Sequence, residues 1–168
     1  DAESYATSPT YFGATVGRYG NRISRGKFNL LGTDYQVDCN EKLNHLHGGR
    51  DGWDSRLWST EVDETKNSIT FRTTSEDGEM GFPGRCEIES TYHLEETGLR
   101  IVMKVVPSKT TVINMVHHSY YNLAGHSSGN VLKQHMRLPA NFYIPVDDEL
   151  MPTGEILKVS ETPFDFRS

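Results

Sequence analysis

The sequence predicts an all-β fold, a mostly antiparallel sandwich or barrel, on the strength of three observations. Apolar and polar residues alternate with a period of two in many short segments, which is typical of half-buried strands. Glycine, proline, asparagine and aspartate separate these segments at short intervals. No window of ten or more residues keeps the apolar stripe and the cap of an amphipathic helix. These patterns together indicate one all-β unit.

The expected strands follow one another along most of the chain. Phe28 and Leu30 alternate with polar residues, and a turn over 31–34 leads to Tyr35 and Val37, which predicts a hairpin. Further strands are predicted around Ile69 and Phe71, over 88–94, from Leu99 beyond a turn at 96–98, and at 111–116, 131–138 and 156–159.

Size and composition fit one domain spanning residues 1–168. The formal net charge is −6 and the basic residues are scattered, which argues against nucleic acid or an anionic membrane surface as the partner. No apolar run approaches the ~20 residues of a membrane-spanning helix. Cys39 and Cys86 match no zinc or redox spacing, and we interpret them as reduced thiols. Reduced thiols favour a reducing, cytoplasmic location.

Four of the seven histidines lie in two tight clusters. In an extended segment His45 and His47 would share a face, so one interpretation is a metal site. Such a site needs further ligands, commonly with a glutamate a few residues later, and the sequence GGRDG follows instead, so we expect no metal. Glycines beside a histidine let the backbone approach a bound ligand closely, which makes His47 a candidate pocket residue.

His117 and His118 are adjacent, so on a strand they face opposite sides and at most one enters a given pocket. Imidazole titrates near neutral pH and can both give and take a proton there. The remaining histidines are expected to be solvated surface residues; they are His93, His126 and His135.

The stretch GRYGNRI brings an asparagine between two arginines. Asn21 offers donors and an acceptor, and Arg22 offers a fork of donors, which suits a hydroxyl-rich ligand or a carboxylate. A turn with solvated arginines is the alternative, and the local sequence favours it. The stretch DGEMGFPG, at 77–84, has the glycine and proline content of a loop, and we assign it a structural role.

Five stretches, taken in order, closely resemble the aldose 1-epimerases, the family of the galactose mutarotases. They are GATVGRYGNRISRGKF, NHLHGGRDGW, DGEMGFPG, HHSYYNLAG and IPVDDELMPTGE. The order, the spacing and the sequence between these motifs all match, and the resemblance covers essentially the whole chain. One short motif would be weak evidence, whereas five in register are specific.

The resemblance implies an antiparallel β-supersandwich of the galactose mutarotase type. It implies an isomerase that interconverts the α and β anomers of free aldoses such as galactose and glucose, with a small-molecule sugar as partner and no metal or organic cofactor. In the family, the residues matching Asn21 and Arg22 contact sugar hydroxyls. The residue matching His47 is an active-site histidine, and the one matching His118 is the general acid that protonates the ring oxygen.

Two departures from the family pattern bear on these expectations. His117 stands where the family usually has asparagine, and we expect a changed neighbouring contact and not a lost activity. The chain ends at FDFRS, about halfway along a family member, so the general-base glutamate and a sugar-binding aspartate have no matching positions. By motif position, Glu79, Asp148 and Glu155 lie outside the expected pocket.

Two interpretations of the length follow. The chain is a segment of a longer mutarotase domain that a missing C-terminal segment or a second chain completes, or it is a naturally short relative that binds sugar without efficient turnover. Because half of a supersandwich would leave strand edges unpaired, we favour the first. The related hexose-6-phosphate 1-epimerases are a further alternative, but they would require more cationic residues than Arg18, Arg22 and Arg25 provide.

Overall fold

The computed structural model describes residues 2–6 and 10–168. The chain divides into two compact units, residues 1–119 and residues 120–168. Regular structure is almost entirely strand, and α1 (Ala2–Ala6) is the only α-helix among the described residues. No helix in this part of the chain is long and apolar enough to cross a membrane. The predicted all-β class is confirmed.

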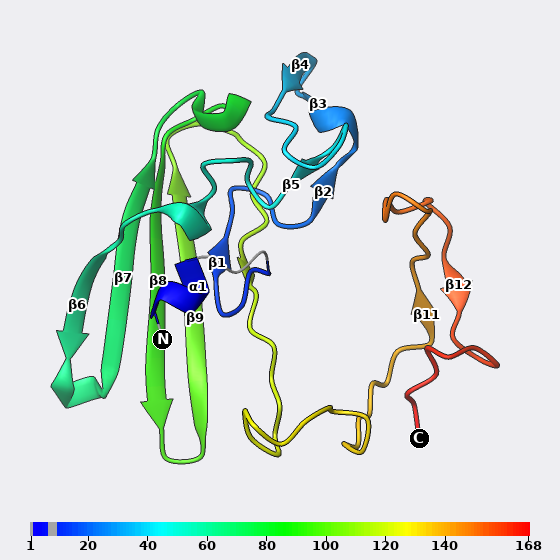
Figure 1. Cartoon of the computed structure of the whole chain (residues 1–168). Helices are drawn as coiled ribbons and strands as arrows, with labels where there is room; N and C mark the ends of the chain where they lie inside the picture. The colour runs from blue at the N-terminus through cyan, green and yellow to red at the C-terminus, as the bar shows by residue number, and fades with distance from the viewer. Residues whose placement is uncertain (1, 7–9) are drawn as a thin grey trace. The chain divides into compact units, whose positions relative to one another are not determined.

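The largest element of the first unit is a four-stranded antiparallel sheet whose strands follow in sequence order (Figure 1). Its strands are β6 (Ser59–Asp63), β7 (Ser68–Ser75), β8 (Cys86–Glu95) and β9 (Gly98–Pro107). In the first half of β8, Cys86, Ile88 and Ser90 are buried while Glu87 between them is exposed. This alternation is the period-two pattern that predicted the strands around residue 69 and over 88–94, while a largely apolar run after a turn predicted the strand from Leu99.

Short connections join these strands. Residues 96 and 97 link β8 to β9, so the predicted turn at 96–98 is confirmed except that Gly98 already pairs with Glu95. The 3-10 helix η3 (Glu64–Lys66) links β6 to β7. The Asp63 carboxylate accepts from the backbone N–H groups of Thr65 and Lys66, both at 3.1 Å, which caps this turn.

A small core packs against the sheet. Trp53, in the 3-10 helix η2 (Trp53–Ser55), is buried together with Cys86 and Ile88. The Trp53 N–H donates to the carbonyl of Gly17 at 3.1 Å. A Cβ at Gly17 would lie 2.2 Å from the Trp53 ring, so only glycine permits this approach.

Two short strand pairs bring distant parts of the sequence together beside the sheet. β1 (Thr15–Val16) pairs with β10 (Val116–His117), and β2 (Arg22–Ile23) pairs with β5 (His45–Leu46). Each pair has only two residues per strand, so these pairs position loops more than they form a sheet. The second unit contains a third such pair, β11 (Phe142–Tyr143) with β12 (Leu157–Lys158).

The predicted hairpin is confirmed as β3 (Lys27–Leu30) and β4 (Thr33–Gln36). Its turn is shorter than the predicted 31–34, because Leu30 already pairs with Thr33. The two central residues, Leu31 and Gly32, have φ of 52° and 85°, the left-handed pair of a tight hairpin turn. The 3-10 helix η1 (Ser24–Gly26) precedes the hairpin, and η4 (Glu79–Gly81) lies in the 77–84 loop.

Three of the strand predictions need correction. The strand predicted at 111–116 is confined to β10, which begins at Val116. The strand at 156–159 is confirmed only as β12, and the strand at 131–138 is wrong. In that last stretch Gln134 N–H donates to Val131 O at 2.9 Å and the Asn130 side chain accepts from Leu132 N–H, so local turns take up the backbone groups.

Candidate functional site

His47 follows β5 and is tied to Asn21 by two reciprocal hydrogen bonds. The Asn21 N–H donates to His47 Nδ1 at 2.9 Å, and the His47 N–H donates to Asn21 O at 3.2 Å. Because Nδ1 accepts, the neutral imidazole carries its proton on Nε2. Both residues have left-handed backbones, with φ of 66° at Asn21 and 53° at His47. Such non-glycine conformations cluster at functional sites.

His118 follows directly after β10, and the segment before β1 holds its backbone. The His118 N–H donates to Ala14 O at 2.9 Å, and the Gly13 N–H donates to His118 O at 3.3 Å. The ring centroid of His118 lies 5.0 Å from that of His47, with the two ring planes 86° apart. The structure therefore brings together two imidazoles that come from separate sequence motifs.

His117 faces a different neighbour from His118, as predicted for adjacent residues. Its ring lies 5.8 Å from the ring of Tyr92 on β8, and its Nδ1 lies 3.4 Å from the Tyr92 hydroxyl. Burial lowers the pKa of His117. This side chain contacts the sheet, while the neighbouring imidazole contacts His47.

Arg22, on β2, is held by Glu41 in a two-point ion pair. Arg22 Nε donates to Glu41 Oε2 at 2.9 Å and Nη2 donates to Oε1 at 2.5 Å. These hydrogen bonds raise the pKa of Arg22 and lower that of Glu41. The third nitrogen, Nη1, lies 3.4 Å from Asn21 Oδ1. The pair fixes the plane of the guanidinium beside Asn21 and balances its charge.

His47 is neutral at physiological pH. Burial lowers the pKa of its imidazole to about 4, and the nearby His118, Arg22 and His45 act in the same direction. Glu41 is the opposing influence, since its negative charge favours the protonated form. With its proton on Nε2, the neutral ring can donate a hydrogen bond to a ligand oxygen.

The side chain of His45 does not point to the same place as that of His47. It is fully buried, its Nδ1 lies 2.7 Å from Asp38 O, and its Nε2 accepts from Gly48 N–H at 3.1 Å. The left-handed backbone of His47 ends the extended geometry in which i and i+2 share a face. His45 is thus a structural residue that fixes the turn at Gly48. No cluster of three or more histidine, cysteine, aspartate or glutamate side chains suited to a metal is found among the described residues.

The burial of Arg18 shows that GRYGNRI is not a turn with solvated arginines, the alternative that the local sequence favoured. Its side chain is buried, with 2% exposed, and Nη1 donates to Pro83 O at 2.8 Å while Nη2 donates to Ser75 Oγ at 2.7 Å. These bonds attach the GRYGNRI stretch to the end of β7 and to the 77–84 loop. In that loop Glu79 forms an ion pair with Arg56.

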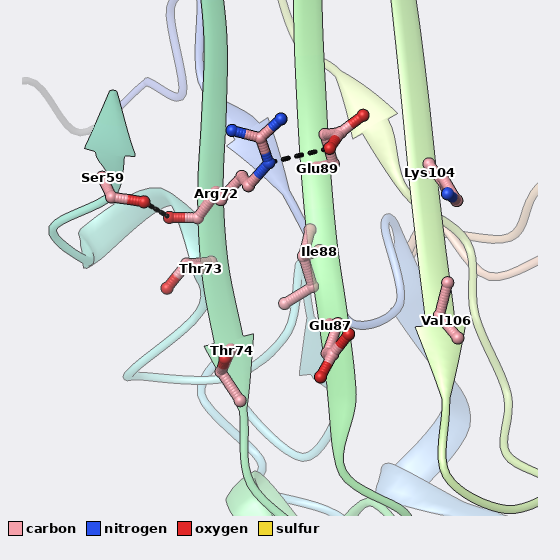
Figure 2. A pocket seen from close by; sticks show the side chains of 9 residues that line it. All are labelled: Ser59, Arg72, Thr73, Thr74, Glu87, Ile88, Glu89, Lys104 and Val106. Atoms are coloured by element: carbon pink, nitrogen blue, oxygen red, sulfur yellow. Dashed lines mark hydrogen bonds and ion pairs between the residues drawn. The ribbon is translucent and has the colours of Figure 1, made fainter. Parts of the chain in front are cut away.

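A separate hollow of about 300 Å³ lies over one face of the four-stranded sheet (Figure 2). Its lining residues are Ser59, Arg72, Thr73, Thr74, Glu87, Ile88, Glu89, Lys104 and Val106. Arg72 Nε donates to Glu89 at 2.9 Å, and its Nη1 donates to Glu61 at 2.5 Å. The hollow contains none of the predicted site residues, and its central cation is already paired with two carboxylates.

The family model described as aldose 1-epimerase matches residues 1–168. The chain belongs to the aldose 1-epimerase family. The suspected resemblance is therefore confirmed, and it extends over every residue of the chain.

Relatives within the aldose 1-epimerase family agree with this assignment. A galactose mutarotase from Mus musculus is 41% identical over 167 residues, which cover 99% of this chain and 48% of the relative. An aldose 1-epimerase from Haemophilus influenzae is 37% identical, with 98% and 48% covered. A crystal structure of an aldose epimerase homologue from C. elegans superposes with a TM-score of 0.87 at 28% identity, covering 100% of this chain and 51% of that chain.

These relatives confirm the galactose mutarotase-like fold. The chain spans about half the length of the curated relatives it matches. Within that half, the residues singled out from the aldose 1-epimerase motifs lie together, with Asn21 bonded to His47, His47 beside His118 and Arg22 beside Asn21.

Two neighbours of these residues were missed from the sequence. Glu41 holds Arg22, and the ring of Tyr11 lies 4.6 Å from that of His47 and 5.7 Å from that of His118. Glu41 left one weak signal, a carboxylate shortly before the LHGG motif. Tyr11 precedes the first quoted motif by only two residues, but nothing in the local pattern connects an aromatic residue there with a histidine.

Proposed function

We propose that the protein containing this chain is an aldose 1-epimerase that interconverts the α and β anomers of free aldoses such as galactose and glucose. The observation that carries the proposal is the contact of the His47 and His118 rings, 5.0 Å apart, beside the Asn21 and Arg22 side chains. These groups combine proton transfer with hydroxyl recognition in a chain of the aldose 1-epimerase family.

The reaction needs a proton delivered and a proton removed at the same time. His118 gives a proton to the ring oxygen of the sugar while a carboxylate takes the proton of the anomeric hydroxyl, and the bond between the first carbon and the ring oxygen breaks. Rotation about the first carbon–carbon bond turns the aldehyde, and reclosure with the acid and base exchanging roles gives the other anomer. Each acid or base contributes a factor of ~10²–10⁴.

The other residues hold the sugar during the open-chain stage. The neutral imidazole of His47 donates from Nε2 to a sugar oxygen, because its Nδ1 is occupied by the Asn21 N–H. Asn21 and Arg22 bind hydroxyls, with the Arg22 fork oriented by Glu41. Holding the opened chain keeps the aldehyde close to the hydroxyl that must attack it.

The general base comes from outside residues 1–168. Glu41 is a poor base because both of its oxygens accept from Arg22 and its pKa is lowered. Relatives of about twice the length support a completing segment, from the same polypeptide or a second chain. The exposed apolar residues Leu99, Val102 and Val106 on β9 support it as well, since β9 ends the sheet in the described part of the chain. An intact mass of the native protein well above the 19.0 kDa of this chain tests for that segment.

Sugar binding without turnover is the second candidate, because the site within this chain recognises hydroxyls but lacks an evident base. A hexose 6-phosphate substrate has less support, since Glu41 balances the charge of Arg22. A phosphate group would require an unbalanced cation.

Polarimetry of freshly dissolved α-galactose separates these candidates. We expect the intact protein to speed mutarotation above the buffer rate, and His118→Ala to lower the enzymatic rate by ~10²–10⁴. His126→Ala is the control, because His126 is an exposed histidine of the other unit. Galactose affinity with no rate above buffer in the intact protein would favour the binding candidate and refute the epimerase.

A further inference from the structure

Tyr11 contacts both of the proposed site histidines. Its ring centroid lies 4.6 Å from that of His47 at 63°, an edge-to-face contact, and 5.7 Å from that of His118 at 39°. The two imidazoles also contact each other, so the three rings form a closed triangle. Edge-to-face aromatic pairs prefer defined angles, so each ring restricts the orientation of the other two.

The backbone beside Tyr11 is part of the same arrangement. Tyr11 and Ala14 close a turn, with the Ala14 N–H donating to Tyr11 O at 3.1 Å. The carbonyl of Ala14 and the N–H of Gly13 in this turn bond to the backbone of His118, at 2.9 and 3.3 Å. The backbones of Tyr11 and His118 are therefore joined by the hydrogen bonds of one turn, whereas His47 is held separately by Asn21. The Tyr11 ring contacts both histidines and so connects these two parts of the site.

The chemistry of Tyr11 favours a packing role over a proton-transfer role. Burial raises the pKa of its phenol, and the negative charges of Asp54 and Glu41 raise it further, so the hydroxyl stays protonated at neutral pH. The ring is half-buried and packs edge-to-face against the His47 imidazole. The charged or titratable groups that face His47 are His118, Arg22, His45 and Glu41.

We propose that Tyr11 is a positioning residue whose aromatic ring sets the angle between the His47 and His118 imidazoles and shields His47 from water. Its effect on the sugar reaction rests on the proposed epimerase function, but its effect on the two histidines does not. The ring carries the role, and the hydroxyl does not. Tyr11→Phe should therefore preserve the angle between the two imidazoles and the shielding of His47, whereas Tyr11→Ala and Tyr11→Leu should remove them.

The direct test follows the histidine ring protons by NMR across a pH titration of the intact protein. We expect Tyr11→Ala to raise the pKa of His47 from about 4 towards its ordinary value by about one unit or more, since burial is the main cause of its depression. Tyr11→Leu should raise it less, and Tyr11→Phe should leave it within ~0.3 of the wild-type value. Nuclear Overhauser contacts between the Tyr11 and His47 rings should be present in the wild type.

Tyr92→Phe is the control, because the Tyr92 ring and hydroxyl contact His117, the histidine that faces the sheet. It should leave the titration of His47 unchanged. The absence of nuclear Overhauser contacts between the Tyr11 and His47 rings in the wild type overturns the proposal, whether or not any variant folds. An unchanged His47 titration in folded Tyr11→Ala overturns it as well.

The kinetic test uses the same variants in the polarimetric assay. We expect Tyr11→Ala to lower kcat by ~10-fold or more with little change in KM, and to move the acid limb of the pH–rate profile upward together with the pKa of His47. Equal effects of Tyr11→Phe and Tyr11→Ala would overturn the positioning role of the ring. If the wild type shows no mutarotation, the epimerase proposal fails while the NMR titration still decides the role of Tyr11.

Discussion

The imidazole rings of His47 and His118 lie 5.0 Å apart with their planes 86° to each other. The two residues come from loops that follow different strand pairs, β2–β5 and β1–β10. A hydrogen bond donated by the Asn21 N–H holds His47, and a hydrogen bond accepted by the Ala14 carbonyl holds His118. In a near-perpendicular pair the edges of the two rings face different directions. The two imidazoles can therefore form hydrogen bonds with two different oxygens of one small ligand.

The depressed pKa of His47 predicts a pH dependence of stability. The folded protein binds this proton only near pH 4, whereas a histidine of the unfolded chain binds it near ~6.5. Between these values the unfolded chain holds more protons, so the free energy of unfolding falls as the pH drops from about 7 through about 4, and this group causes no further loss below that. We expect His47 to account for roughly 1–2 kcal/mol between about pH 7 and about pH 5.

Urea unfolding of the wild type and of His47→Asn at these two pH values measures this contribution. Asparagine suits the replacement because it tolerates the left-handed backbone at this position. The variant should lose less stability than the wild type on acidification, while His126→Asn should behave as the wild type does. If His47→Asn kept the pH dependence of the wild type, groups other than His47 would be the cause of the loss of stability on acidification.

The pair between Arg22 and Glu41 predicts a selective effect on ligand binding. Glu41→Gln leaves the side-chain shape but removes the charge that orients and balances the guanidinium. We expect galactose affinity to weaken by ~2–10-fold, and affinity for a hexose 6-phosphate to improve relative to galactose because Arg22 becomes an unbalanced cation. Calorimetric titration of both sugars into the intact protein measures the two changes.

Glu61→Gln is the matched control for that substitution. Glu61 also pairs with an arginine, Arg72, but beside the hollow of Figure 2 and not beside the histidines. The Glu61→Gln substitution should change neither the affinity for galactose nor that for hexose 6-phosphate. An equal response of both variants would mean that overall charge, and not the orientation of Arg22, determines binding.

The sequence predicted the long elements of the fold because their pattern is local. β7, β8 and β9 are eight or ten residues long, with apolar and polar residues alternating in parts of β7 and β8 and a largely apolar run in β9. The two-residue pairs β1–β10 and β2–β5 have no period to detect and depend on distant contacts such as Asn114 Nδ2 donating to Gly20 O at 2.9 Å. The strand predicted at 131–138 was wrong because the Asn130 side chain and a local backbone turn take up the backbone N–H groups there instead.

The candidate site was predictable where residue type and motif coincide, as at His47 and His118. It was not predictable where a residue acts through a neighbour that is distant in sequence. Tyr11 and Glu41 are of this second kind, since their partners are set by the fold. The burial of Arg18 was missed for the same reason, because its acceptors lie in the 77–84 loop and at Ser75.

The buried Arg18 side chain predicts a large effect on stability. Arg18→Met keeps much of the apolar length but leaves the buried acceptors Pro83 O and Ser75 Oγ without their donor. We expect a loss of about 2–4 kcal/mol in the free energy of unfolding. Arg50→Met is the control, since the Arg50 side chain is 72% exposed, and it should cost under about 0.5 kcal/mol. Similar midpoints in urea for the two variants would contradict a structural role for Arg18.

Gly48 predicts how strictly the His47 loop depends on glycine. It has φ of 100°, and a Cβ there would lie 1.7 Å from Gly17 O, a backbone atom that cannot move aside as a side chain can. Gly48→Ala should therefore cost about 3 kcal/mol or more and displace His47 from His118. Gly78→Ala is the matched control, because its φ is 82° but nothing lies within 4 Å of its Cβ position, and it should cost only about 1 kcal/mol. Urea unfolding measures both costs, and the His47 ring resonances report the displacement. Equal costs would mean that the left-handed backbone alone, and not the close approach of Gly17, requires glycine in this loop.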